Sequence, residues 1–318
     1  MKLSFRSVFI VLALFSMLAI SACGSATPAP STAPAPAAPA ATATEMPDDE
    51  PEPIENKADD PEFALPDFEA AKFSNPIKID NKYFPMTPGS QSVFEGITEE
   101  GGREIPHSII FTVTDLTKEI MGVNTVVAYI EDYSDGQLVE AEIAFYAQAD
   151  DGTVWFMGEH PEVYEDGVMV EAPTWIPGLK GSQAGIVMKA NPQMNVPSYG
   201  QGWGPAVNWT DRGRVVGMGE QTCVPVACYE DVLVTEEFNQ SEPDAFQVKY
   251  YAPGVGNVQV GWRGEDASHE VLELVEYTQL NPDDLAEIRD TALALEQHAY
   301  EISKEVYTQT KPSEYESP

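Results

Sequence analysis

The sequence predicts a mainly β protein, a curved antiparallel sheet or half-barrel meander with long loops and one C-terminal helix. After about residue 73, apolar and polar residues alternate with a period of two, as strands with one buried face require. The pairs Asp135-Gly136, Asp151-Gly152 and Asp166-Gly167 lie 16 and 15 residues apart and supply the positive φ of tight hairpins. Near the C-terminus the period becomes that of a helix.

Composition and charge exclude several classes of protein. The 318 residues include 17 Lys and Arg against 52 Asp and Glu, a formal net charge of −35. A nucleic-acid-binding protein needs a basic surface, so that class is excluded, and charge attraction to an anionic membrane is excluded for the same reason. A hydrophobic content of 43% is enough for a core, and three Cys are too few for a disulfide-dense scaffold.

Residues 1–22 are predicted to be a lipoprotein signal peptide. Lys2 and Arg6 precede an apolar run of 13 residues, Val8–Ile20, which is shorter than the ~20 residues that span a bilayer. The following Ser21-Ala22-Cys23 is typical of a bacterial lipobox, so Cys23 is expected to carry the lipid, with acyl chains such as palmitate. We therefore expect a protein anchored in the cell membrane or outer membrane and facing outside the cytoplasm. An ordinary secretory signal with an incidental Cys is the alternative.

Residues 23–72 are predicted to be a disordered tether. Gly24–Thr44 has no charged residue and consists mostly of Ala, Pro, Thr and Ser, which favour extended conformations. Glu45–Lys72 then contains eleven acidic and two basic residues, which extend the segment by repulsion. The segment would hold a domain away from the membrane, or serve solubility alone.

The domain at residues 73–280 is expected to be an antiparallel β domain. In Glu140–Gln148 the apolar positions alternate with Glu140, Glu142, Ala144 and Tyr146. Further strands are expected around Arg214–Thr222, Glu230–Phe238, Phe246–Tyr251, Asn257–Trp262 and Glu270–Tyr277. Pro173–Gly219 is rich in Gly, Pro, Asn, Met and Trp and is expected to form long loops with one or two short strands, where binding function usually lies on a β scaffold.

A helix is predicted over residues 281–308, followed by a disordered tail at 309–318. Asn281 suits the N-cap and Pro282 the first helical position. The apolar residues step by three and four, at Leu285, Ile288, Ala292, Leu295, Ala299, Ile302 and Val306. The helix is expected to pack on the sheet, and weak self-association as a coiled coil is the alternative.

Four phrases resemble an uncharacterised bacterial family of secreted and lipid-anchored proteins. They are Asn81–Gly89 (NKYFPMTPG), Thr153–Glu159 (TVWFMGE), Tyr229–Thr235 (YEDVLVT) and Lys249–Gly256 (KYYAPGVG). The resemblance covers about residues 75–262 and implies one β-rich extracytoplasmic domain, with no activity to transfer. The chain departs from the family in its Cys pair and in the loop from Asn191 to Trp209.

The remaining cysteines, Cys223 and Cys228, are expected to form a disulfide. Outside the cytoplasm a close Cys pair is more often oxidised than bound to a metal. Reduced thiols are the alternative. Redox catalysis is the least expected role, since four intervening residues do not match the two-residue spacing of thioredoxin-type redox motifs.

The sequence offers little sign of catalysis. Its four His form no metal-binding motif, and there is no nucleophile elbow, P-loop or dinucleotide fingerprint, so neither a metal nor a cofactor is expected. Glu159 and His160, close to Trp155, are the candidate residues if the protein is a secreted hydrolase.

A Gly-rich loop is the candidate binding element. It contains Tyr199, Trp203 and Trp209, whose flat faces suit sugar rings or apolar ligands, although they could instead cap the open end of the sheet. Together with Trp155, Glu159 and His160, they predict non-catalytic binding of an unknown small molecule or envelope partner. The alternatives are a hydrolase and a purely structural envelope protein. An apolar pocket in a curved sheet favours binding, converging carboxylates favour hydrolysis, and a domain without a pocket favours a structural role.

Overall fold

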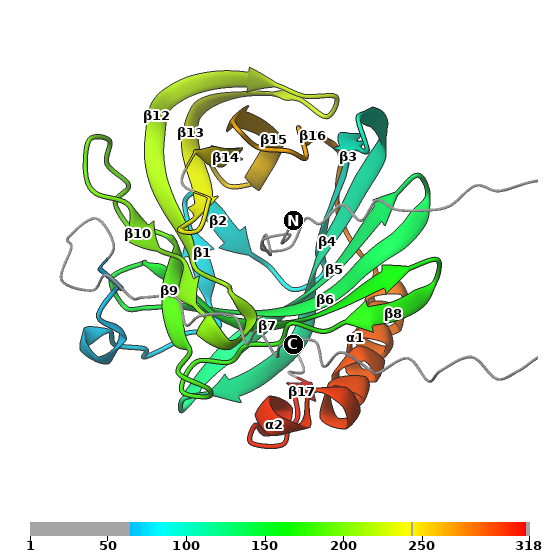
Figure 1. Ribbon diagram of the computed structural model, residues 1–318. Coiled ribbons are helices and arrows are strands. Elements are labelled where there is room, and N and C mark those ends of the chain that lie inside the picture. Colours follow the sequence, from blue (N-terminus) through cyan, green and yellow to red (C-terminus); the bar gives the residue numbers. More distant parts are fainter. Residues whose placement is uncertain (1–63, 243, 316–318) are drawn as a thin grey trace, which may run out of the picture. The chain divides into compact units, whose positions relative to one another are not determined.

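A computed structural model describes residues 64–242 and 244–315, and the predicted signal peptide, Cys23 and most of the predicted tether lie outside them (Figure 1). The strands of the first half are β1 (Ile79–Asn81), β2 (Phe84–Met86), β3 (Ser90–Glu100), β4 (Arg103–Ile120), β5 (Val123–Ser134), β6 (Gln137–Gln148), β7 (Val154–Glu165) and β8 (Val168–Glu171). The second half has β9 (Gln183–Met188), β10 (Tyr199–Gly200), β11 (Gly202–Trp203), β12 (Asp211–Cys223), β13 (Cys228–Asn239), β14 (Ala245–Ala252), β15 (Gly256–Gly264), β16 (Val271–Gln279) and β17 (Glu314–Tyr315). The helices are α1 (Pro282–Ile302) and α2 (Lys304–Tyr307), with short 3-10 turns at Phe68–Ala70 and Pro205–Val207.

The main sheet consists of two antiparallel meanders. Strands β3 to β7 pair in chain order, β12 to β16 do the same, and the β16–β3 pairing joins the two sets. Figure 1 shows the meanders as two arcs with the hairpin of β1 and β2 between them. The predicted fold class is confirmed: the sheet is a nearly closed antiparallel half-barrel, with one main C-terminal helix.

The predicted turn residues join neighbouring strands. Asp135-Gly136 connects β5 to β6 and Asp166-Gly167 connects β7 to β8, and all four residues have positive φ between 49° and 75°. Gly152, at φ 92°, lies in the connection from β6 to β7. These conformations suit Asp and Gly and would strain most other side chains.

The segment around Tyr199–Trp203 brings the two ends of the sheet together. Strand β10 pairs with β12 at one end of the strand order, and β11 pairs with β9 at the other. Only Gln201 separates β10 from β11 in the sequence. The region Pro173–Gly219 therefore contributes three short strands, β9 to β11, where one or two were expected. The glycines and prolines of this region interrupt any period of two, and the strands pair with residues distant in sequence. The number of strands could therefore not be predicted from local pattern.

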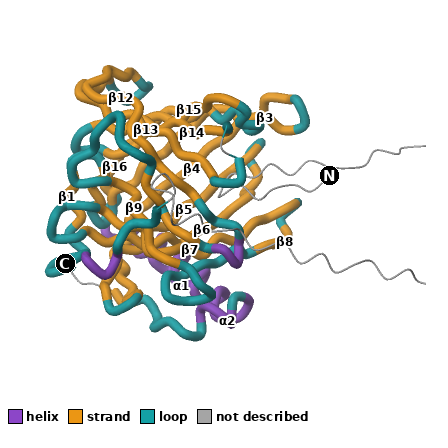
Figure 2. The backbone as a smooth tube through the Cα atoms, turned by 60° about the vertical axis from the view of Figure 1, so that its left-hand side comes forward, coloured by secondary structure: helices purple, strands orange, loops and turns teal. Residues whose placement is uncertain are grey.

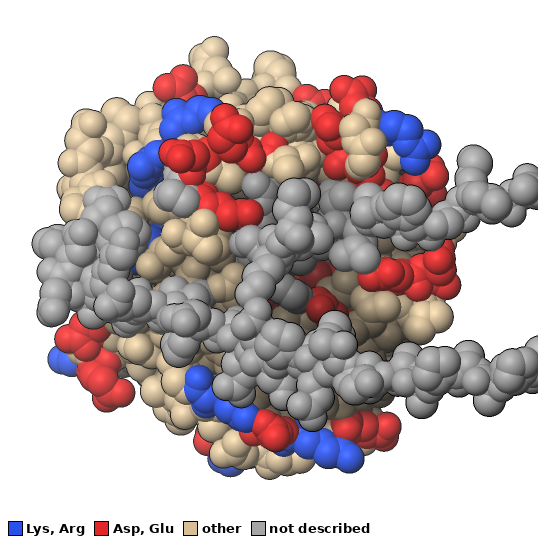
Figure 3. All heavy atoms as spheres, in the orientation of Figure 1, with Lys and Arg blue, Asp and Glu red and all other residues tan. Residues whose placement is uncertain are grey.

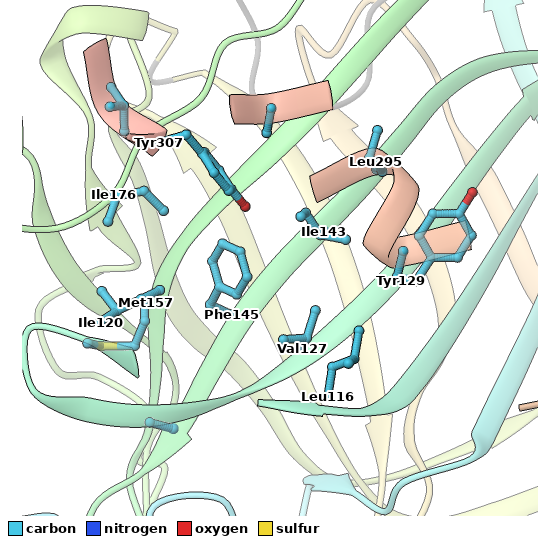
Figure 4. Close-up of a cluster of buried hydrophobic side chains, with 14 of the residues drawn as sticks. Leu116, Ile120, Val127, Tyr129, Ile143, Phe145, Met157, Ile176, Leu295 and Tyr307 are labelled. Atoms are coloured by element: carbon cyan, nitrogen blue, oxygen red, sulfur yellow. The ribbon is translucent and has the colours of Figure 1, made fainter. Parts of the chain in front are cut away.

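Strand β6 is buried on both faces, although its alternation predicted one buried and one solvated face. Ile143 and Phe145 lie in an apolar cluster beneath the C-terminal helices, together with Leu116, Val127, Tyr129, Met157, Leu295 and Tyr307 (Figure 4). Ala144 and Tyr146 face the concave side of the sheet and belong to a second cluster. The polar positions of the alternation therefore face the interior of the half-barrel and not solvent.

The C-terminal helix packs on the convex side of the sheet. Asn281 caps α1 by accepting hydrogen bonds from the backbone N–H groups of Asp283 and Asp284 at 3.0 and 3.1 Å. Ala292, Leu295, Ala299 and Val306 of the predicted seam are buried against the sheet, so these positions are not free for a coiled coil. Figure 2 shows α1 and α2 together on one side of the strands.

Contacts with the domain reach back before residue 73. The Phe68 ring lies edge-on to Trp155, with 5.2 Å between ring centroids, and Phe73 packs beside both. The main-chain carbonyl of Ala64 accepts a hydrogen bond from Arg212. Residues 64–72, assigned to the tether from their charge, are thus partly docked, because their few aromatic side chains have an apolar surface to cover.

The disulfide between Cys223 and Cys228 is present and closes the hairpin of β12 and β13. Figure 3 shows Asp and Glu side chains spread over the visible face, with Lys and Arg among them. Within the described ranges, no helix is both long and apolar enough to cross a membrane.

Candidate ligand-binding cavity

The concave side of the sheet encloses a cavity of about 280 Å³. Aromatic side chains form a prominent part of its wall, among them Phe84 of β2, Phe111, Tyr146, Phe156 and Tyr251 from strands of both meanders, and Trp209 from the loop before β12. Polar side chains interrupt this wall, chiefly Glu142, Glu159, Glu237, Gln247 and Lys249. An apolar cavity with a few convergent polar groups is the usual form of a small-molecule site.

The β1–β2 hairpin forms one side of the cavity. Asn81 fixes it, accepting a hydrogen bond from the Tyr83 N–H at 2.9 Å and donating to the carbonyl of Gly152 at 2.9 Å. This places the Phe84 ring 5.4 Å from Tyr146 and 6.3 Å from Tyr251, measured between centroids. One short hairpin thereby connects the aromatic residues of the two meanders.

A stack of rings continues the wall towards the closing segment. Tyr146 and Phe156 stack at 5.1 Å, and Phe156 meets Trp209 edge-on at 5.4 Å. Trp209 lies 4.8 Å from Trp175, and both indoles cover Gly202. A Cβ on Gly202 would lie 2.6 Å from each indole, so glycine is needed there for close packing and not for an exposed, flexible loop.

Gly158 determines which face Glu159 occupies. Ala144 pairs with Glu159 and Tyr146 pairs with Phe156, so β7 has one more residue than β6 across this interval. Gly158 sits in this bulge at φ 99°, and a Cβ there would lie 2.5 Å from the carbonyl oxygen of Trp175. A bulge reverses the inward and outward alternation, and this one turns Glu159 into the cavity.

Glu142 and Glu159 form a hydrogen-bonded carboxyl pair in the cavity wall. The Trp175 indole N–H donates to Glu159 Oε1 at 2.9 Å. Burial raises the pKa of Glu142 to about 7, against the opposing effects of the Glu159 hydrogen bond and the Lys249 charge. Burial, followed by the neighbouring Glu142 charge, holds the pKa of Glu159 well above its ordinary value. The pair therefore retains at least one proton at neutral pH.

Lys249 lies across the cavity and is paired with Glu237. Its ammonium is 2.7 Å from Glu237 Oε2, and the Tyr251 hydroxyl donates to Glu237 Oε1 at 3.3 Å. Burial opposes the charged lysine, but the Glu237 carboxylate outweighs it and raises the pKa of Lys249. The positive charge of this lysine is therefore already neutralised.

A second buried polar cluster lies near the ends of β4, β5 and β16. The His107 ring contacts Glu270 Oε1 at 2.8 Å and Asp132 Oδ1 at 3.4 Å, and Gln247 donates to Glu270 Oε2 at 2.6 Å. Burial raises the pKa of Asp132 to about 7. Burial opposes protonation of His107, but Glu270 and Asp132 outweigh it and raise the pKa of His107.

The residues predicted to form the site are divided between the two faces of the sheet. Glu159 and Trp209 line the cavity, while Tyr199 and Trp203 are buried in the closing strands outside its lining. Trp155 belongs to the cluster on the convex side. His160 also lies there, 2.5 Å from the Thr174 hydroxyl and beside the Tyr307 ring. Glu159 and His160 are therefore not brought together as a hydrolase would need.

Sequence reasoning missed most of the cavity wall. Glu142 and Tyr146 stood in the polar half of an alternation and were assigned to the solvated face. The signal was nevertheless present, because three of the four phrases used for the family resemblance contribute to the lining: Phe84, Pro85 and Met86 from the first, Phe156 and Glu159 from the second, and Lys249, Tyr251, Val255 and Gly256 from the fourth.

Comparisons with known proteins give two similar folds. No protein-family model matches the chain, and no curated protein matches it. One similar solved structure comes from Bacteroides fragilis and is described as an exported protein with a YmcC-like fold, with 14% identity, a TM-score of 0.38, and coverage of 62% of this chain and 99% of that one. Another, from Parabacteroides distasonis, is described as a lipoprotein, with 12% identity, a TM-score of 0.34, and coverage of 62% and 99%. At these identities and TM-scores, no family or function is assigned from the similarity.

Proposed function

We propose that this protein is a lipid-anchored, extracytoplasmic ligand-binding protein without catalytic activity. Its site would be the cavity on the concave side of the sheet, and its ligand a small, largely apolar molecule. Anchoring through Cys23 rests on the signal-peptide pattern. The disulfide between Cys223 and Cys228 suits an oxidising compartment outside the cytoplasm.

The observation that carries the proposal is the aromatic cavity. A volume of about 280 Å³ accommodates a small molecule of up to three rings. A closed structural domain would fill this space with side chains, since protein interiors are packed as densely as organic crystals. Here rings from both meanders surround the space without filling it, which supports a binding role over a purely structural one.

The test is binding of N-phenyl-1-naphthylamine, an uncharged fluorophore at neutral pH. We expect its fluorescence to rise on addition of the full-length protein. Val187 lines the cavity, so Val187→Phe fills part of the space and should weaken binding at least tenfold. The matched control is Val170→Phe on the exposed strand β8, which should bind as the wild type does.

Two outcomes would count against a binding cavity. One is the absence of any fluorescence change with the wild-type protein. The other is equal binding by Val187→Phe and Val170→Phe. Melting temperatures of both variants must accompany the titration, because overpacking an interior costs about 1–3 kcal/mol.

A secreted hydrolase is the second candidate, favoured by the convergence of Glu142 and Glu159. Two carboxyl groups that share a proton can act as acid and base towards a bound water. The active residues would then be this pair and not Glu159 with His160. This candidate requires a substrate that the wild-type protein turns over and that Glu142→Gln does not.

A further inference from the structure

Within the part of the chain that the structure describes, the carboxyl group of Glu142 has no hydrogen-bonded partner of opposite charge. Its side chain is 3% exposed and lines the cavity. Among the described residues, the only side chain that hydrogen-bonds it is Glu159, itself an acid. The positive charge of Lys249 acts on Glu142 electrostatically, but the Lys249 ammonium is hydrogen-bonded to Glu237. Burying an ionisable group without a partner is costly, and such groups concentrate where a ligand completes the pairing.

We infer that the ligand of this cavity is an organic cation, an apolar molecule whose ammonium group binds between Glu142 and Glu159. The inference rests on the proposed binding function and names the chemical class of its ligand. An ammonium donates hydrogen bonds to the Glu142 carboxyl oxygens and to Glu159, whose Oε1 already accepts one from Trp175. Its charge replaces the proton that the pair otherwise holds.

The rings next to the pair suit the same ligand. Tyr146 lies two periods of the alternation from Glu142 on the same face of β6, beyond Ala144, and Phe156 stacks against it. Phe84 packs against Tyr146 and Tyr251. Aromatic faces attract cations within about 6 Å and also cover the apolar part of the molecule. A neutral or anionic ligand would gain less from this combination.

The electrostatic surroundings of the pair are mainly acidic. Glu140, on the same face of β6, has a pKa held well above its ordinary value by burial and by the charges of Glu142 and Asp132. Among the described residues, the titratable groups that interact with the pair are Glu140, Asp132, Tyr146 and Lys249. Further acidic side chains line the same cavity, namely Asp211, Glu237, Glu242 and Asp266. The pairing of Lys249 with Glu237 is charge-neutral, so the remaining carboxyls leave the cavity favourable to a cation.

The experiment compares three probes of similar shape by isothermal titration: 4-phenylbutylamine, 4-phenylbutan-1-ol and 4-phenylbutyrate. With the wild-type full-length protein at pH 8, we expect the amine to bind at least tenfold more tightly than the alcohol, and the carboxylate to bind most weakly. The preference for the amine should shrink at pH 5.5, where binding must first displace a proton from the pair. The amine itself stays cationic at both pH values, because alkyl ammonium groups have pKa values near ~10.

Glu142→Gln tests the cation site independently of the cavity as a whole. This variant should lose the preference for the amine over the alcohol, whereas Glu165→Gln, at the exposed end of β7, should keep that preference. Equal affinity of the wild type for amine and alcohol would overturn the inference and leave the binding cavity standing. If neither these probes nor the naphthylamine binds, the proposed function fails as well.

Discussion

At the scale of single residues, one glycine decides the chemistry of the cavity. Without the extra residue at Gly158, strict alternation from Phe156 would turn Glu159 away from Glu142 and place His160 on the concave side. The carboxyl pair exists because the bulge at Gly158 shifts the alternation of β7 by one residue relative to β6. This position is not visible in the sequence, since Gly158 stands in an ordinary strand-like phrase and a bulge is defined only by its pairing partner.

The carboxyl pair makes stability depend on pH, which gives the prediction at this scale. Burial raises the pKa of Glu142 from an ordinary value of 4.5 to about 7, so the folded state binds its proton more tightly than the unfolded chain does. The stability associated with this proton is complete below pH ~4.5 and is lost as the pH rises through ~7. Glu142→Gln removes this titrating group, so we expect the variant to become more stable relative to wild type as the pH rises from 4.5 to 8.

Urea unfolding of both proteins at the two pH values measures this gain. Glu165→Gln provides the exposed comparison and should follow the wild-type curve at both pH values. A wild-type-to-variant difference that stays constant from pH 4.5 to 8 would show that Glu142 is not a buried acid with a raised pKa.

At the scale of elements, the local pattern of β6 is predictable from the sequence, whereas the surroundings of its two faces are not. Its alternation, both its ends and the turn at Asp135-Gly136 follow from local pattern. The environment of β6 does not follow from local pattern. A period of two shows that the two faces of a strand differ, but it does not show which part of the protein covers each face. Both are buried, one beneath α1 and the other around the cavity. The same reasoning applies to α1, whose cap and seam are local features while its packing partner is not.

The attachment of α1 gives the prediction at this scale. Lys118 is fully buried on β4, and its ammonium contacts Glu296 of α1 at 2.8 Å. Removing one member of a buried ion pair leaves the other charge without compensation, at a cost of about 3–5 kcal/mol. We therefore expect Lys118→Met to lower the free energy of unfolding by this amount and to speed amide exchange along α1.

The matched control is the exposed pair of Lys180 and Glu305. Lys180→Met should leave unfolding unchanged, because solvent screens an exposed pair. In the double variant Lys118→Met/Glu296→Gln, part of the lost stability should return. If Lys118→Met unfolds like Lys180→Met, the buried pair does not hold the helix to the sheet.

At the scale of the whole molecule, the class of fold was accessible from the sequence and the closure of the sheet was not. Asp-Gly turns and alternating strands predict a meander. The pairing of β16 with β3 and the closing strands β10 and β11 join residues far apart in the chain. Of the predicted site residues, Glu159 and Trp209 reach the cavity, whereas the rest of its lining depends on curvature that no local pattern records.

The predicted anchor can be tested independently of the cavity. Cys23→Ser removes the thiol that would receive the lipid, so we expect the variant to move from the membrane fraction to the soluble fraction and to be processed unlike the wild type. Each acyl methylene buried in a membrane contributes ~0.8 kcal/mol, so loss of the lipid should release the protein. Immunoblots of fractionated cells measure both effects, and a variant still processed and membrane-bound like wild type would rule out this anchor.

Strand β12 has one further consequence. It has 13 residues, yet the short β10 pairs only with Arg212 and Gly213 at its beginning, and its ladder to β13 shifts register three times between Val215 and Thr222. Such irregularities bend a strand out of the flat form that templates intermolecular sheet growth. Copies of the lipid-anchored protein proposed above would meet each other on one membrane at high local concentration. We expect the irregular, disulfide-closed edge to hinder strand-to-strand pairing between such copies.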